Sequence, residues 1–139
     1  MRARIAVLAA LAALAGCTDE LDEFRGDLRP LEQRAEEQRS VVSGLLRSLE
    51  LGSRADARGV REQAANLSAT YDEIAELDPP DDYAKPFASY VEANRTLVSD
   101  LDRFAAELES GDLRGLRQAS DRALDALTSA QTSSLRWLE

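Results

Sequence analysis

The sequence predicts an all-α protein, an up-down-up-down antiparallel four-helix bundle preceded by a cleaved signal peptide. Apolar residues recur every three or four positions in four successive stretches, as on one face of a helix. No stretch alternates with the period of two that is typical of a strand. The links between the stretches are only a few residues long, which favours antiparallel neighbours. A three-helix bundle with one detached helix, the first or the last, is the alternative.

The first element, residues 1–16, has the composition of a signal peptide. Arg2 and Arg4 make the start basic, and residues 5–15 are uncharged and rich in alanine and leucine. This run is about half of the roughly 20 apolar residues that a helix needs to cross a bilayer. Acidic residues follow from Asp19 onward. We therefore expect the segment to be removed and not to remain as a membrane anchor.

The segment ends in Leu14-Ala15-Gly16-Cys17, an aliphatic residue, two small residues and the single cysteine. In this position it resembles the lipobox of bacterial lipoproteins. The resemblance implies cleavage between Gly16 and Cys17 and attachment of a diacylglyceryl group to the Cys17 sulfur, with further acyl chains such as palmitate. Several chains anchor a protein stably. The implied location is the extracytoplasmic side of the cell envelope: the periplasmic face of the outer membrane in a Gram-negative host, or the outer face of the cell membrane in a Gram-positive one.

The first helical stretch follows, with residues 17–26 as a lipidated N-terminus and short acidic tether or helix extension, and residues 27–139 as the bundle. Pro30 disturbs it, because its ring would press on the carbonyl of Gly26. Either Asp27 caps a new helix with Pro30 in its first turn, or one long helix is kinked near Gly26. We expect an interruption or a bend between Gly26 and Pro30. The predicted core stripe is Leu21, Phe24, Leu28, Leu31, Ala35, Gln38, Val42, Leu45 and Leu49.

The second stretch is expected to start after a helix stop at Gly52. Ser53-Arg54-Ala55-Asp56 is similar to a capping box, with Asp56 in the place of the usual glutamate. The helix should end near Leu77. Its predicted core stripe is Ala57, Val60, Ala64, Leu67, Tyr71 and Ile74.

The third stretch follows a turn at Asp78-Pro79-Pro80, where two prolines stop the preceding helix. It should begin near Asp82 or Lys85. This turn and the aromatic helix after it resemble a pattern in small secreted helical proteins of unassigned role. The predicted stripe is the broadest in the chain: Phe87, Tyr90, Val91, Asn94, Leu97, Val98, Leu101, Phe104, Ala105 and Leu108.

The fourth stretch is expected to begin at an Asp112 N-cap, directly after a helix-ending Gly111. Its predicted stripe is Leu113, Leu116, Ala119, Ala123, Leu124, Leu127, Ala130, Leu135 and Leu138. Trp137 lies beside the last two, and we expect it to pack against the end of the bundle.

Composition excludes several kinds of chemistry. The chain has no histidine and one cysteine, so histidine-based acid–base catalysis, the common zinc sites and disulfides are absent. Removing residues 1–16, with Arg2 and Arg4, would take the net charge from −9 to −11. Such a surface repels nucleic acid and anionic headgroups. We therefore expect no catalytic residues, cofactor, metal or nucleic acid.

A few residues depart from the apolar pattern. Gln38 and Asn94 interrupt apolar stripes, and we interpret them as a polar pair that sets the register of the helices or as rim residues. Tyr71, Tyr83 and Tyr90 are expected to pack at the Pro79-Pro80 end with their hydroxyls in water. The sequence therefore predicts a membrane-tethered, non-enzymatic module that binds a protein partner or organises the envelope. A small-ligand carrier that uses the bundle interior is the alternative.

Overall fold

The computed structural model describes residues 4–50 and 56–133, with side chains described for residues 19–48 and 56–133. These residues form α1 (Arg4–Glu50), α2 (Ala57–Ala75), the 3-10 turn η1 (Asp81–Tyr83), α3 (Ala84–Ser110) and α4 (Leu113–Ser133). The described part of the chain contains no strand. The all-α prediction is thereby confirmed.

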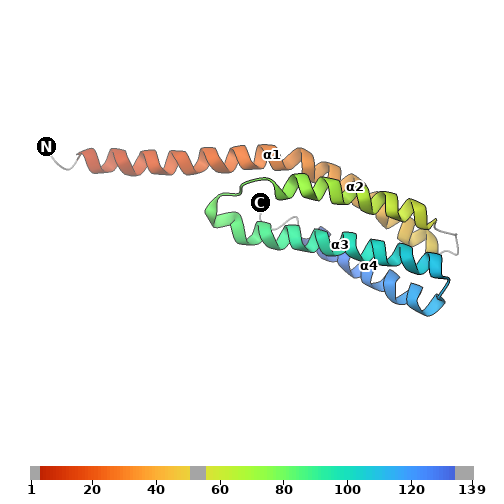
Figure 1. Cartoon of the computed structure of the whole chain (residues 1–139). Coiled ribbons are helices and arrows are strands. Elements are labelled where there is room, and N and C mark those ends of the chain that lie inside the picture. Colours follow the sequence, from red (N-terminus) through yellow and green to blue (C-terminus); the bar gives the residue numbers. More distant parts are fainter. Residues whose placement is uncertain (1–3, 51–55, 134–139) are drawn as a thin grey trace.

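The four α-helices make an antiparallel bundle (Figure 1). Each helix lies beside the next along the chain, and α1 closes the ring by a short contact with α4. The diagonal pairs, α1 with α3 and α2 with α4, do not approach each other along the backbone. The N-terminal part of α1 projects from the end of the bundle where α2 turns into α3. This is the predicted four-helix arrangement, without a detached helix.

Helix α1 runs through Pro30 without a break, so the predicted interruption and the Asp27 N-cap are wrong. Two features let the helix continue. Pro30 is exposed, so water can reach the Gly26 carbonyl that lacks a backbone partner, and a bend of the helix can relieve the contact of the proline ring with that carbonyl. The axis of α1 changes direction in its orange part, which contains this proline (Figure 1). Residues 17–26 belong to the same helix and so form a helix extension.

The buried face of α1 differs from the predicted stripe by one position in its second half. Arg39 and Leu46 are buried, whereas Gln38 and Leu45 are only partly so. The stripe predicted from a repeat of 3.5 residues contains Gln38 and Leu45 instead. The buried residues of this face are Phe24, Leu28, Ala35, Arg39, Val42 and Leu46, so spacings of seven and of eleven both occur. All of them lie on one side of the helix.

Helix α2 begins three residues later than the predicted capping box implies. Asp56 is itself the N-cap, and its carboxylate accepts the Arg58 backbone N–H at 3.0 Å. The assignment of Asp56 as the glutamate substitute is therefore wrong; Gly52 and Ser53 lie outside the described residues. The helix ends at Ala75, and all of its predicted stripe residues are buried or partly buried.

Helices α3 and α4 follow the sequence-based expectations more closely. All ten predicted stripe residues of α3 are buried or partly buried. Gly111 ends α3 with a φ of 73°, the left-handed conformation that glycine adopts without strain. Asp112 then accepts the Arg114 backbone N–H at 3.0 Å as the N-cap of α4. Leu113 is 81% exposed, so its place in the predicted stripe is wrong. Leu135, Trp137 and Leu138 lie outside the described residues.

Candidate functional site

Gly16 and Cys17, the predicted cleavage and lipid-attachment residues, belong to α1, and their side chains lie outside the described part. The first side chain of α1 known to enter the core is Phe24, about 10 Å along the helix from Cys17 at a rise of 1.5 Å per residue. Phe24 packs edge-on against Phe87 of α3, with ring centroids 5.4 Å apart. The helix that contains Leu14-Ala15-Gly16-Cys17 is therefore the one that enters the bundle.

No helix in the described residues is long and apolar enough to cross a bilayer.

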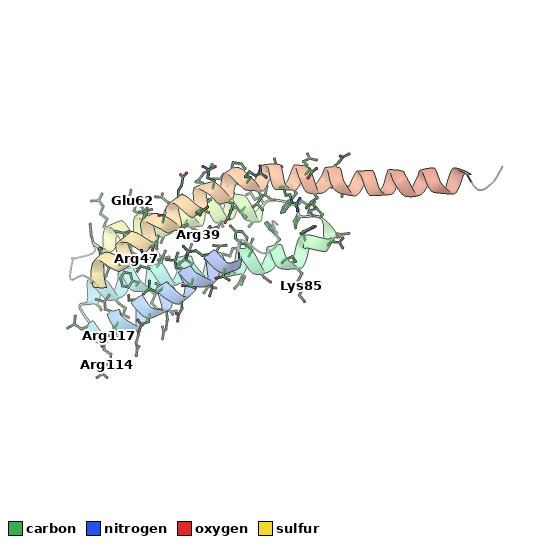
Figure 2. All side chains as sticks on the ribbon, turned by 180° about the vertical axis from the view of Figure 1, so that it is seen from behind. Arg39, Arg47, Glu62, Lys85, Arg114 and Arg117 are labelled. Carbon is green, nitrogen blue, oxygen red and sulfur yellow. The ribbon has the colours of Figure 1, made fainter. Side chains whose placement is uncertain are left out.

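The most unusual feature of the interior is a polar cluster formed by Glu32, Arg39, Tyr71 and Tyr90. Arg39 Nη2 lies 2.7 Å from Glu32 Oε1, and Arg39 Nη1 donates to the Tyr71 hydroxyl at 3.3 Å. The Tyr90 hydroxyl donates to Glu32 Oε2. The cluster therefore links α1 to α2 through Tyr71 and to the diagonally placed α3 through Tyr90. Figure 2 places Arg39 in the middle of the bundle, with Lys85 toward one end and Arg114 and Arg117 toward the other.

Burial governs the protonation of this cluster. The side chains of Arg39 and Glu32 are 3% and 14% exposed, and Tyr71 and Tyr90 are 2% and 1% exposed. Burial alone would lower the pKa of Arg39, but the charge of Glu32 and hydrogen bonds to its neighbours outweigh it and raise that pKa. Burial, and then the negative charge of Glu32, raise the pKa of Tyr90. Burial also raises the pKa of Tyr71, against the opposing effect of Arg39. The cluster therefore holds an ion pair and two neutral phenols.

This arrangement corrects the prediction for the tyrosines. Tyr71 and Tyr90 lie inside the bundle with their hydroxyls on the ion pair and not in water. Tyr83 lies apart from them on η1 and is half-buried. The sequence analysis did not identify Glu32 and Arg39, because charged residues of a helix in a bundle usually lie on its solvent face. Their separation of seven residues, two helical turns, was the available signal that both lie on one side of α1.

Gln38 and Asn94, the predicted polar pair, lie in different environments. Asn94 is fully buried and donates from Nδ2 to the Tyr90 carbonyl at 2.8 Å, while its Oδ1 has no hydrogen-bond partner in the described residues. Gln38 is half-buried on α1. No hydrogen bond joins the two side chains within the described part. Asn94 is thus an extension of the polar cluster along α3, not the partner of Gln38.

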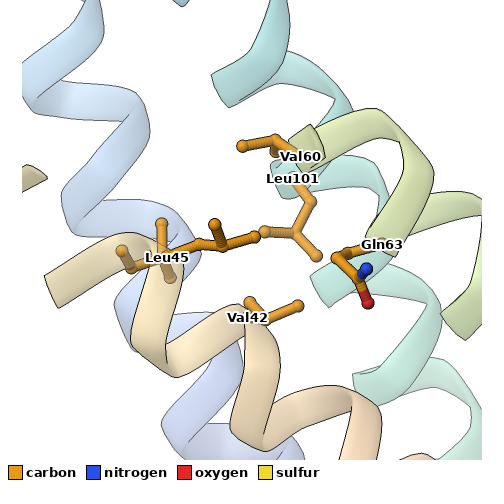
Figure 3. A pocket seen from close by; sticks show the side chains of 6 residues that line it. Val42, Leu45, Val60, Gln63 and Leu101 are labelled. Atoms are coloured by element: carbon orange, nitrogen blue, oxygen red, sulfur yellow. The ribbon is translucent and has the colours of Figure 1, made fainter. Parts of the chain in front are cut away.

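The bundle interior offers little space for a ligand. A recess between α1, α2 and α3, whose lining side chains are shown in Figure 3, leaves no room even for a water-sized molecule. Its lining residues are Val42, Leu45, Leu46, Val60, Gln63 and Leu101. A second recess of about 210 Å³ is lined by side chains of α1 alone, among them Arg29, Glu32 and Glu36. Each carboxylate oxygen of Glu32 has a partner, Arg39 for one and Tyr90 for the other. Within the described residues, no three acidic, cysteine or histidine side chains are grouped to hold a metal ion.

Comparisons of the chain with protein-family models, curated proteins and solved structures found no match.

Proposed function

We propose that this chain is an extracytoplasmic lipoprotein whose helical bundle is held at a membrane by Cys17 and binds a protein partner without catalysis. The observation that carries the proposal is the lipobox-like Leu14-Ala15-Gly16-Cys17 directly behind a basic, apolar segment. The continuity of α1 supports it, because one helix would connect the lipid to the core. The tightly filled interior gives the alternative, a small-ligand carrier, no support.

The position of α1 implies an orientation for the anchored bundle. Its N-terminal extension leaves the bundle at the turn between α2 and α3 (Figure 1). The exposed acids Asp19, Glu20, Asp81 and Asp82 lie on these two segments. Anionic headgroups repel such an end, so the bundle would stand away from the bilayer. The opposite end, where α3 turns into α4, would then face a partner.

The anchor is tested by substituting Cys17→Ser and following the chain through cell fractionation. The lipid thioether needs a thiol, so we expect wild-type protein in the membrane fraction and the variant uncleaved after Gly16. Thr18→Ser is the matched control and should behave as wild type. A Cys17→Ser chain that is still cut after residue 16 and remains with membranes as the wild type does would contradict the proposal.

The partner-binding role is tested by photo-cross-linking in the native host. A photoreactive side chain is placed at exposed Leu113, at the end proposed to face a partner, or at exposed Asp82 near the membrane. We expect a discrete protein adduct from position 113 and a much weaker one from position 82. Absence of any adduct at both positions, together with unaltered envelope properties after deletion of the gene, would count against an interaction module.

A further inference from the structure

The four helices do not contribute equally to the bundle. Helix α3 packs extensively against both α4 and α2, whereas α1 makes a smaller contact with α2 and a short one with α4. Helix α1 also contains Pro30, which lacks the backbone N–H that a helix interior uses. Helices α2, α3 and α4 therefore form the better-packed unit, and α1 is the helix whose separation loses the least contact.

The polar cluster is distributed unevenly between α1 and the unit of α2, α3 and α4. Both charged members, Glu32 and Arg39, belong to α1, while α2 and α3 contribute only the neutral hydroxyls of Tyr71 and Tyr90. If α1 separates, its ion pair leaves with it and regains water. The remaining face keeps no buried charge, only two phenols that water solvates readily. A buried ion pair shared between helices would instead leave an unpaired charge behind.

We propose that α1 is a strap that undocks reversibly from a three-helix unit of α2, α3 and α4, with the polar cluster as its latch. The latch fixes the position of α1 in the closed state through Tyr71 and Tyr90. Undocking uncovers side chains of α2 and α3 that face α1, among them Val60, Tyr71 and Leu101. The occupant that fits this face is an amphipathic helix with the buried pattern of α1, that of residues 19–48 of a second copy of this chain. The proposal does not depend on lipidation of Cys17.

Native-state hydrogen exchange of the full-length chain tests the strap. We expect amides of residues 31–48 to exchange together, at least about tenfold faster than the most protected amides of α2, α3 and α4. Exchange of all four helices as a single unit would overturn the proposal. This measurement needs no variant, so it remains decisive if a substitution prevents folding.

Two variants and a control test the latch. Tyr90→Phe removes the hydroxyl that α3 gives to Glu32 and should speed exchange of α1 alone. Replacing Glu32 and Arg39 together by methionine removes the desolvation cost that favours undocking of α1, so exchange of α1 should slow to the rate of the other helices. Arg61→Gln breaks the exposed α2–α3 pair with Glu109, so α1 exchange should not change. Equal acceleration of all helices by Tyr90→Phe would contradict a latch and indicate a general loss of stability.

The vacated face is tested with a labelled synthetic peptide of residues 19–48. We expect slow incorporation into the full-length chain, with a rate that saturates at high peptide concentration because undocking limits it. A peptide with Leu28 and Val42 changed to serine is the control and should not enter. Absence of incorporation of the wild-type peptide under conditions where α1 amides exchange would overturn the assigned occupant.

Discussion

Helices α1 and α3 lie diagonally across the bundle and bury different kinds of side chains. Helix α3 buries aromatic and aliphatic residues along its length, with Asn94 as its only fully buried polar residue. Helix α1 buries a charged arginine in the middle of its face and carries a proline. Their backbones remain apart, and the two helices meet through side chains, which include the Tyr90–Glu32 hydrogen bond and the edge-on contact of Phe24 with Phe87.

Helices in one small bundle therefore need not be held equally strongly, as α1 and α3 show. Burial of apolar area is the main stabilising contribution, and α3 receives it from both neighbours. Helix α1 combines a smaller apolar contact with an ion pair whose desolvation cost offsets much of its attraction. Position within the bundle, and not helix length, therefore decides how strongly a helix is held.

The largest effects are expected from matched core leucines. Leu97 of α3 and Leu28 of α1 are both 0% exposed. Truncation to alanine should cost about 4–5 kcal/mol at Leu97 and about 2–3 kcal/mol at Leu28, because the less constrained α1 can move to reduce the cavity. Chemical denaturation monitored by circular dichroism gives both values. Equal losses would show that the two helices are packed equally tightly.

Breaking the ion pair should have the next largest effect. Glu32→Gln leaves Arg39 buried without its counter-charge and should destabilise the fold by about 3 kcal/mol. The double change of Glu32 and Arg39 to methionine should restore stability to wild type or raise it by about 1–4 kcal/mol. A double variant as unstable as the single one would mean that the pair contributes net stability. Denaturant midpoints of the three proteins distinguish these outcomes.

Pro30→Ala should stabilise the chain and reduce the difference in stability between α1 and α3. Alanine supplies the missing backbone N–H and removes the contact with the Gly26 carbonyl, for a gain of up to about 3 kcal/mol in an exposed helix interior. Thermal unfolding measures the gain. A lower melting temperature would show that the bend at this position is needed for packing of α1.

Alkali should act on the two buried phenols that join α1 to its neighbours. Their folded-state pKa values are raised, so the unfolded chain releases these protons first as the pH increases. Stability is therefore complete below about pH 10 and falls above it, by up to about 1.4 kcal/mol per tyrosine for each pH unit. Tyrosinate absorbance should rise together with loss of helical signal. Ionisation of all three tyrosines in a fully helical protein would contradict the buried cluster.

The sequence predicted the bundle and the face of α3 well, because uninterrupted apolar periodicity leaves one way to bury that helix. It predicted the face of α1 less well. Gln38 and Arg39 are adjacent, and polarity alone favours the glutamine for burial. The ion pair with Glu32 and the hydrogen bond to Tyr71 make the buried position of Arg39 favourable, and Tyr90 in turn binds Glu32. Pro30 was likewise misjudged, since its exposure on the outer side of α1 depends on the whole bundle.

The polar cluster could not be predicted from sequence for a related reason. Its four members come from three helices, and the order of helices around the bundle decides whether they meet. Prediction of the cleavage and lipid site is of another kind. It depends on a local pattern around Cys17 that an enzyme would read before the chain folds, so the packing of the bundle does not affect it.

The most direct test of the account is mass spectrometry of the N-terminal peptide of the protein isolated from membranes of its host. We expect a chain that begins at Cys17 and carries a diacylglyceryl group on the sulfur. A chain that still begins at Met1, or a mature chain with a free Cys17 thiol, would contradict it.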